Sequence, residues 1–136
     1  MTRPPGTVET KDMVFPEDSN HHGTLFAGQG LQRLARAAFI AARQATGCEV
    51  VMAAVTGVQF LAPVPVGRAL ALRAWVSRIG RSSLTVCVHG LAEAPGCAPE
   101  RVLEGVFELV AVDGKGRPRA IATAYVTASP SQQETP

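Results

Sequence analysis

A short polar segment ahead of an alanine-rich stretch carries the side chains best suited to chemistry. It contains Asn20, His21 and His22, and it ends shortly before Gly28. If a helix begins at this point, its first backbone N–H groups have no partners and carry partial positive charge. They can stabilise an oxyanion, an acyl carbonyl or a phosphate placed against Gly28, whose missing Cβ lets such a group approach the backbone. The segment therefore predicts a site at a helix N-terminus.

Each of these residues also has an alternative role. An asparagine in a loop commonly builds a turn, and Gly28 could instead allow a helix to pack closely on a sheet. An imidazole side chain suits general base catalysis near neutral pH, which makes His21 and His22 candidate general bases; the alternative is a solvent-exposed pair without a catalytic part. Glu17 and Asp18 could act as well, or could simply complement the helix dipole.

Apolar periodicity indicates the elements that position this segment. A first strand is expected over residues 7–15, and a helix from about Leu25 to Thr46, with Gly47 as its C-cap. The apolar positions of this helix recur at helical spacing: Leu31, Leu34, Ala35, Ala38, Ala42 and Ala45. Small alanine side chains would let a sheet pack closely around the helix.

After Gly47 the apolar period changes to two, which predicts strands. The alternating segments and the expected last strand are 70–77, 84–89, 103–110 and 120–127. Turn signals separate them at 63–67, 80–81, 95–99 and 113–118. A strand, one long helix and a run of strands is the order of an α+β domain in which an antiparallel sheet packs on a single helix. Because such a sheet covers only one side of its helix, we expect pairing with a second copy.

Composition is consistent with one compact domain over residues 1–136, with an ordered core of about 7–128 and flexible tails rich in Pro, Ser and Gln. A net charge of +2 and scattered arginines argue against nucleic acid as a partner. No apolar run is long enough to span a membrane, and the N-terminus lacks the apolar stretch of a signal peptide, so we expect a cytoplasmic protein. The three cysteines show no paired spacing, so we expect no disulfide. His89 has no second His or Cys at the spacing of metal ligands, so we expect no metal site.

Four segments together resemble the hot-dog-fold acyl-CoA thioesterases. The first has the family pattern Asp-x-Asn-x-x-Gly-x-Leu-Phe-Gly-Gly before a helix, and its matching residues here are Asp18, Asn20, Gly23, Leu25, Phe26 and Gly28, with Ala27 in place of the first glycine of the pair. The others follow in the family's order at 58–67, 80–83 and 107–113. Single motifs of this kind are weak, but four in order and at the right spacing are specific.

The resemblance implies a hot-dog fold, in which one long central helix is covered by a curved antiparallel sheet. It implies hydrolysis of an acyl-CoA thioester to the free acid and CoA, with no cofactor beyond the coenzyme A of the substrate. It also implies a homodimer or a higher homo-oligomer, with sites where two subunits meet.

The resemblance, together with imidazole chemistry for the two histidines, gives expected roles to residues along the chain. Asn20, His22, Gly28 and Thr56 are the expected catalytic residues, with His22 preferred to His21 because it adjoins Gly23. The expected substrate-binding residues are His21, Phe60, Pro63, Arg81, Ser82 and Ser83, of which the last three would meet the nucleotide end of CoA through phosphate contacts. The alternatives are a plain strand residue for Thr56, core packing for Phe60 and a solvated basic turn at Arg81.

The chain departs from the family at one position of the helix. Where relatives carry a catalytic Asp or Glu, this sequence has Ala35, followed by Arg36. One hypothesis is a thioesterase in which the loop residues, or an acid of the partner subunit, replace that carboxylate. The second hypothesis is an acyl-CoA-binding or regulatory protein that does not hydrolyse its ligand. A hydratase is a third possibility, but the Asp-x-x-x-x-His arrangement of such enzymes is absent.

Overall fold

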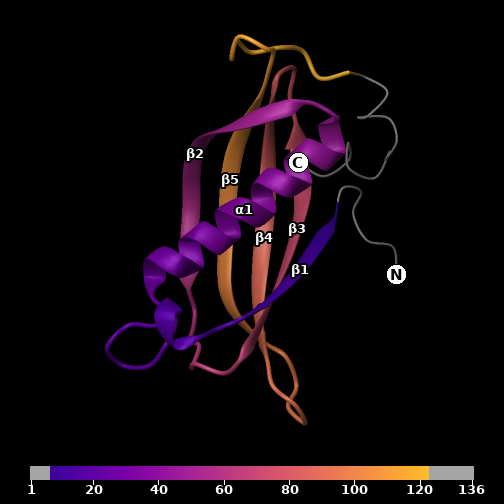
Figure 1. The fold of residues 1–136 in the computed structure, drawn as a ribbon. Coiled ribbons are helices and arrows are strands. Elements are labelled where there is room, and N and C mark those ends of the chain that lie inside the picture. The colour runs from indigo at the N-terminus through magenta and orange to yellow at the C-terminus, as the bar shows by residue number, and fades with distance from the viewer. Residues whose placement is uncertain (1–6, 123–136) are drawn as a thin grey trace.

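The computed structural model describes residues 7–122, and it contains one long helix against one sheet (Figure 1). The elements in chain order are β1 (Val8–Met13), a short 3-10 helix η1 (Pro16–Asp18), α1 (Ala27–Thr46), β2 (Glu49–Phe60), β3 (Ala69–Ile79), β4 (Ser83–Glu93) and β5 (Glu100–Val112). The strands pair antiparallel in the order β1-β3-β4-β5-β2. The predicted α+β arrangement is thereby confirmed.

Helix α1 has the predicted end and starts slightly later than predicted. It begins at Ala27 and ends at Thr46, where Gly47 adopts a left-handed conformation with φ 66° and donates its N–H to Arg43 O. This geometry is the predicted glycine C-cap, since a residue with a Cβ is strained at such a φ. The buried Thr46 hydroxyl donates to Ala42 O at 2.8 Å, which closes the last turn.

The buried face of α1 is rotated from the predicted stripe. Three predicted positions are fully buried: Leu34, Ala38 and Ala42. However, Leu31 is 38% exposed and Ala35 is half-buried, while Ala37 and Ala41 are buried instead. The reason is that β3, which lies on the β1 side of the sheet, contacts α1 more than any other strand does, so the helix turns its Ala37 flank inward.

The two edges of the sheet differ in length and chemistry. Edge strand β1 is short, and its outward Glu9 and Lys11 form ion pairs with Arg73 and Glu93 at 2.9 and 3.4 Å. Edge strand β2 is twice as long and leaves Val51 and Val55 about half exposed. Charges on a short strand discourage further pairing, whereas a long apolar edge favours it.

Of the last strand predicted over 120–127, only residues 120–122 are described. Arg119 donates its N–H to Ala111 O, and Ile121 donates to Arg81 O, but residues 120–122 form no regular strand. Positions 123–127, like both predicted flexible tails, lie outside the described residues. Within residues 7–122, no helix is long and apolar enough to cross a membrane.

Candidate active site

The polar segment before α1 is a loop organised by one side chain, that of Asn20. Its Oδ1 accepts hydrogen bonds from the backbone N–H groups of His22 and Thr24, at 2.9 and 3.2 Å, and its Nδ2 donates to Thr24 Oγ1 at 3.0 Å. The turn role of this asparagine is confirmed. Its Nδ2 has a second N–H, for which residues 7–122 supply no acceptor, so the amide also offers a free donor.

Two long-range hydrogen bonds fasten this loop to the segment that follows β2. Leu25 donates its N–H to Val64 O at 2.8 Å, and Val66 donates to Gly23 O at 3.0 Å. These bonds place the turn of Asn20 beside the end of β2. Two stretches of chain that are far apart in the sequence thereby line the same pocket.

The pocket between the loop, α1 and β2 has a volume of about 240 Å³. It is lined by Asn20, Leu25, Ala27, Phe60, Leu61, Ala62, Pro63, Val64 and Leu103. The structure thus brings together three residues predicted for the site, Asn20, Phe60 and Pro63. The lining combines one amide with apolar side chains, which suits an acyl group whose carbonyl meets a polar end.

The first turn of α1 adds backbone donors at the mouth of this pocket. Phe26 occupies the N-cap position without a side-chain cap, and the first turn contains no acidic residue. The N–H groups of Ala27, Gly28 and Gln29 therefore have no acceptor within residues 7–122, whereas Gly30 donates to Phe26 O. Such donors stabilise negative charge that develops on an oxygen.

The backbone of Gly28 lies against a neighbouring ring, that of the half-exposed Phe26. A Cβ on Gly28 would lie 2.7 Å from Cε2 of Phe26, so the ring occupies the space beside this backbone. A substrate carbonyl that approaches Gly28 on that side would meet the Phe26 ring, which is exposed and can shift. Gly30 is the glycine packed at the pocket, since a Cβ there would lie 3.2 Å from the Phe60 ring. Its signal in the sequence was a glycine one turn before Leu34 on the apolar stripe.

The two histidines lie at the exposed tip of the loop. Their rings are in contact at a tilt of 41°, with centroids 3.9 Å apart, and neither lines the pocket of the same chain. Thr56 is exposed on β2, at an irregular stretch of its pairing with β5, and its hydroxyl donates to Val106 O at 3.1 Å. Thr56 is not among the residues that line the pocket.

The predicted nucleotide-binding turn lies at the other end of the sheet (Figure 1). Ser83 pairs with Val110 near the end of β5, whereas Phe60 pairs with Leu103 towards its start. Arg81 is exposed, and its guanidinium has no partner within the described chain; Ser83 Oγ accepts a hydrogen bond from Arg78 at 3.3 Å. A single chain therefore does not bring Arg81, Ser82 and Ser83 to the pocket of Asn20.

Ala35 stands on the helix flank that faces away from β1. Arg33 contacts Asp12 of β1, and residues two apart on a helix point to nearly opposite flanks. Ala35 is half-buried between the partly exposed Leu31 and Phe39. No carboxylate lines the pocket, so the described chain supplies no acid at this place.

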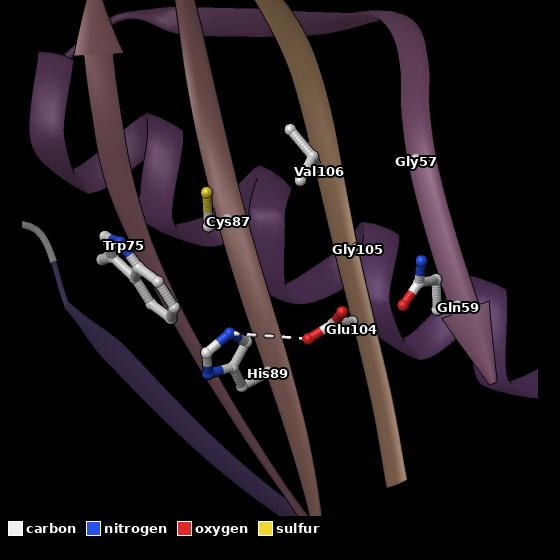
Figure 2. Close-up of a pocket in the computed structure, with 8 residues that line it drawn as sticks. All are labelled: Gly57, Gln59, Trp75, Cys87, His89, Glu104, Gly105 and Val106. Atoms are coloured by element: carbon white, nitrogen blue, oxygen red, sulfur yellow. Dashed lines mark ion pairs between the residues drawn. The ribbon is translucent and has the colours of Figure 1, made fainter. Parts of the chain in front are cut away.

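A second depression of about 240 Å³ lies on the sheet face opposite α1 (Figure 2). Its lining includes Gln59, Trp75, Cys87, His89 and Glu104. Burial is the main cause that lowers the pKa of His89, and the nearby Arg101 adds to it, while Glu104 acts in the opposite direction. The edge-on contact of His89 with the indole, at 4.7 Å between ring centroids, supports the structural role expected for this histidine. None of the predicted site residues lies here.

The fold and the pocket define a class of protein. Residues 22–98 match the family described as the thioesterase superfamily, and the sheet on a single long helix is the hot-dog fold of the solved neighbours. The chain belongs to the thioesterase superfamily, and within it to the hot-dog acyl-CoA thioester hydrolases. Both the predicted family and the predicted fold are confirmed.

Individual relatives have similar lengths. Acyl-CoA thioester hydrolase YciA of Escherichia coli is 30% identical over 122 residues, which cover 87% of this chain and 92% of that protein. The acyl-CoA hydrolase of Staphylococcus aureus, solved with butyryl coenzyme A, coenzyme A and coenzyme A disulfide, is 27% identical, with a TM-score of 0.82 over 93% of this chain and 84% of the other. A hexameric thioesterase from Yersinia pestis is 30% identical, with a TM-score of 0.79 over 83% and 93%.

Three further structures of the S. aureus enzyme are alanine variants. An asparagine, a threonine or an aspartate was replaced, and the TM-scores with this chain are 0.84, 0.82 and 0.83.

Proposed function

We propose that this protein hydrolyses acyl-CoA thioesters at a site that lacks the helix carboxylate of its relatives. The observation that carries the proposal is the pocket in which Asn20 and the first turn of α1 meet the apolar end of β2. In the reaction, the oxygen of water bonds to the acyl carbon, the C–S bond breaks, and a proton reaches the sulfur of CoA. The free N–H of Asn20 and the amides at Gly28 stabilise the negative oxygen that forms in between.

The position of the missing acid is supported by spacing. The asparagine and the aspartate replaced in the S. aureus variants are separated by the same number of residues as Asn20 and Ala35. The replaced threonine is not separated from that asparagine by the same number of residues as Thr56 is from Asn20. Spacing therefore does not support Thr56 as the counterpart of that threonine.

His22 is the proposed general base, and Thr56 is proposed to orient water. A base must titrate near the working pH and reach the attacking water. The loop joins His22 to the amide of Asn20 through the hydrogen bond from its backbone N–H, and no carboxylate of the same chain lines the pocket. His21 is the alternative, on the same loop tip.

The site is proposed to be complete only in a dimer formed through β2. Antiparallel pairing of two β2 edges covers Val51 and Val55 and continues the sheet into the partner. In this arrangement the two β2 strands run in opposite directions. The end of the partner's sheet that carries the turn at 80–83 therefore lies beside Phe60 of this chain. A hexamer, as in the Y. pestis relative, would be built from such dimers.

The direct test is release of free thiol from acyl-CoAs of different chain lengths by the purified protein. We expect turnover well above the rate without protein for at least one of them. A protein that binds acyl-CoA in calorimetry and releases no thiol would contradict hydrolysis. That result would favour a non-hydrolytic acyl-CoA binder, the second candidate, for which the specific observation is Ala35.

Arg81→Ala is expected to weaken acyl-CoA binding by about tenfold and to leave the fold intact, because it removes a charge-assisted phosphate contact of an exposed side chain. Calorimetry with CoA measures the affinity, and thermal melting measures the fold. Equal affinity in wild type and variant would contradict this placement of the nucleotide.

The shared site makes a sharper version of this test possible. Mixed dimers of Arg81→Ala and Asn20→Asp chains contain one site with both residues intact if the site spans two subunits. We therefore expect the mixture to be more active than either variant alone. A mixture no more active than the average of the two would place both residues in one subunit's site.

A further inference from the structure

Asp18 joins the two ends of the loop that carries Asn20. Its Oδ2 accepts the N–H of Phe15, which follows β1, at 3.0 Å. Its backbone oxygen accepts the N–H of Phe26, which precedes α1, at 2.9 Å. One residue thus closes the loop at its base and fixes where the chain enters the helix.

Arg33 ties Asp18 to the body of α1. Its Nη2 lies 3.1 Å from Asp18 Oδ2, and the two side chains are only 11% and 13% exposed. The hydrogen bond from Phe15 N–H is the main cause that lowers the pKa of Asp18; burial opposes it, and Arg33 adds to the lowering. A second carboxylate, that of Asp12, lies 3.4 Å from Arg33 Nε but is 59% exposed. The contact with Asp18 is therefore the sheltered one.

A gain in the stability of the fold does not explain why the Arg33 guanidinium is buried. Its Nη1 is buried, and residues 7–122 offer it no hydrogen-bond partner. A buried donor without a partner destabilises the fold, and a buried ion pair is often no better than apolar residues of the same size. What an ion pair adds is a fixed geometry, because it has one favourable arrangement where apolar contacts have many.

We propose that Arg33 is a positioning residue, which through Asp18 holds the loop of Asn20 against the first turn of α1. Arg33 does not line the pocket of Asn20, so it acts through the loop and not on the substrate. The free N–H of Asn20 and the amides at the start of α1 belong to separate segments, and the Asp18 link sets their distance. The inference rests on the proposed function and adds to it the residue that assembles the donors.

The test is a double-mutant cycle on turnover. Arg33→Met removes the charge and keeps the bulk, and we expect kcat for acyl-CoA to fall about tenfold or more, with a smaller change in KM, since a displaced donor mainly affects the transition state. In an Asn20→Asp background the same substitution should have no further effect on kcat. Arg33→Lys should restore part of the loss. The matched control, Asp12→Asn, removes the exposed partner of Arg33 and should keep wild-type kcat.

Some outcomes would overturn the proposal. One is a kcat effect of Arg33→Met that persists undiminished beside Asn20→Asp, which would mean that Arg33 acts independently of the loop. Another is a variant with lower thermal stability and unchanged kcat, which would make Arg33 a structural residue only.

A second readout separates this proposal from the proposed function. Amide hydrogen exchange of Phe26 and Thr24 reports the loop without any turnover. We expect faster exchange at both in Arg33→Met and unchanged exchange in Asp12→Asn. If wild type releases no thiol, the proposed function is contradicted, but amide exchange still tests whether Arg33 holds the loop through Asp18. Unchanged exchange in Arg33→Met would overturn this role of Arg33.

Discussion

Ala35→Asp is expected to raise hydrolysis of at least one acyl-CoA by about 10²-fold or more. The position lies on the flank of α1 away from β1, between Leu31 and Phe39. If the donors at Asn20 and Gly28 are in place, a carboxylate there supplies the acid that the family resemblance implies at this position. A positioned base or nucleophile contributes on the order of 10² to 10⁴-fold. Steady-state thiol release with saturating acyl-CoA measures the gain.

The new charge also has a cost, which a control separates from the gain. A carboxylate in a half-buried place loses hydration, so the melting temperature should fall by a few degrees. Gln32→Asp adds the same charge on the exposed face of α1 and should change neither quantity. If Ala35→Asp folds, binds acyl-CoA and shows no gain, the site geometry serves binding, and the non-hydrolytic alternative is favoured.

Asn20→Asp is expected to lower kcat by about 10²-fold with little change in the fold. The substituted side chain keeps the oxygen that accepts from His22 and Thr24, so the turn survives. It replaces the free N–H donor by a negatively charged oxygen, and removal of one oxyanion donor costs about 10² to 10³ in kcat. This choice is cleaner than alanine, which would also dismantle the turn.

Kinetics and melting together decide the role of Asn20. We expect kcat to fall more than KM rises, since the donor acts mainly in the transition state. Thermal melting of Asn20→Asp should match wild type, and Gln32→Asp again controls for the added charge. Wild-type turnover in a folded Asn20→Asp variant would show that Asn20 only organises the turn. The oxyanion donors would then be the N–H groups of the first turn of α1 alone.

Much of the fold could be predicted because its causes are local. The period of the apolar residues changes at Gly47, and that glycine ends the helix because its φ of 66° suits a residue without a Cβ. Alternation placed β3, β4 and β5 close to their observed bounds. The order of Asp18, Asn20, Gly23 and Phe26 identified the family, since a loop that must close on a helix start has few sequence solutions.

The face that α1 buries was predicted less well than its ends. Helical spacing is compatible with several rotations of an alanine-rich helix, because alanines at 35, 37, 38, 41 and 42 differ little in size. Packing of α1 against β3 selected among them and left Leu31 partly exposed. A rotation of this kind is decided by packing between elements.

The site itself was decided by tertiary contacts, whose partners are distant in the sequence. Local propensity could propose a turn at Asn20, but the hydrogen bonds from Leu25 to Val64 O and from Val66 to Gly23 O place that turn beside the end of β2. In the same way, the Phe26 ring occupies the space beside Gly28, and Asp18 pairs with Arg33 rather than with the helix dipole alone. Such pairings depend on where whole segments meet, which no periodicity of a single segment specifies. The sequence therefore determined which groups are available, and the packing of loop, helix and sheet determined which of them meet.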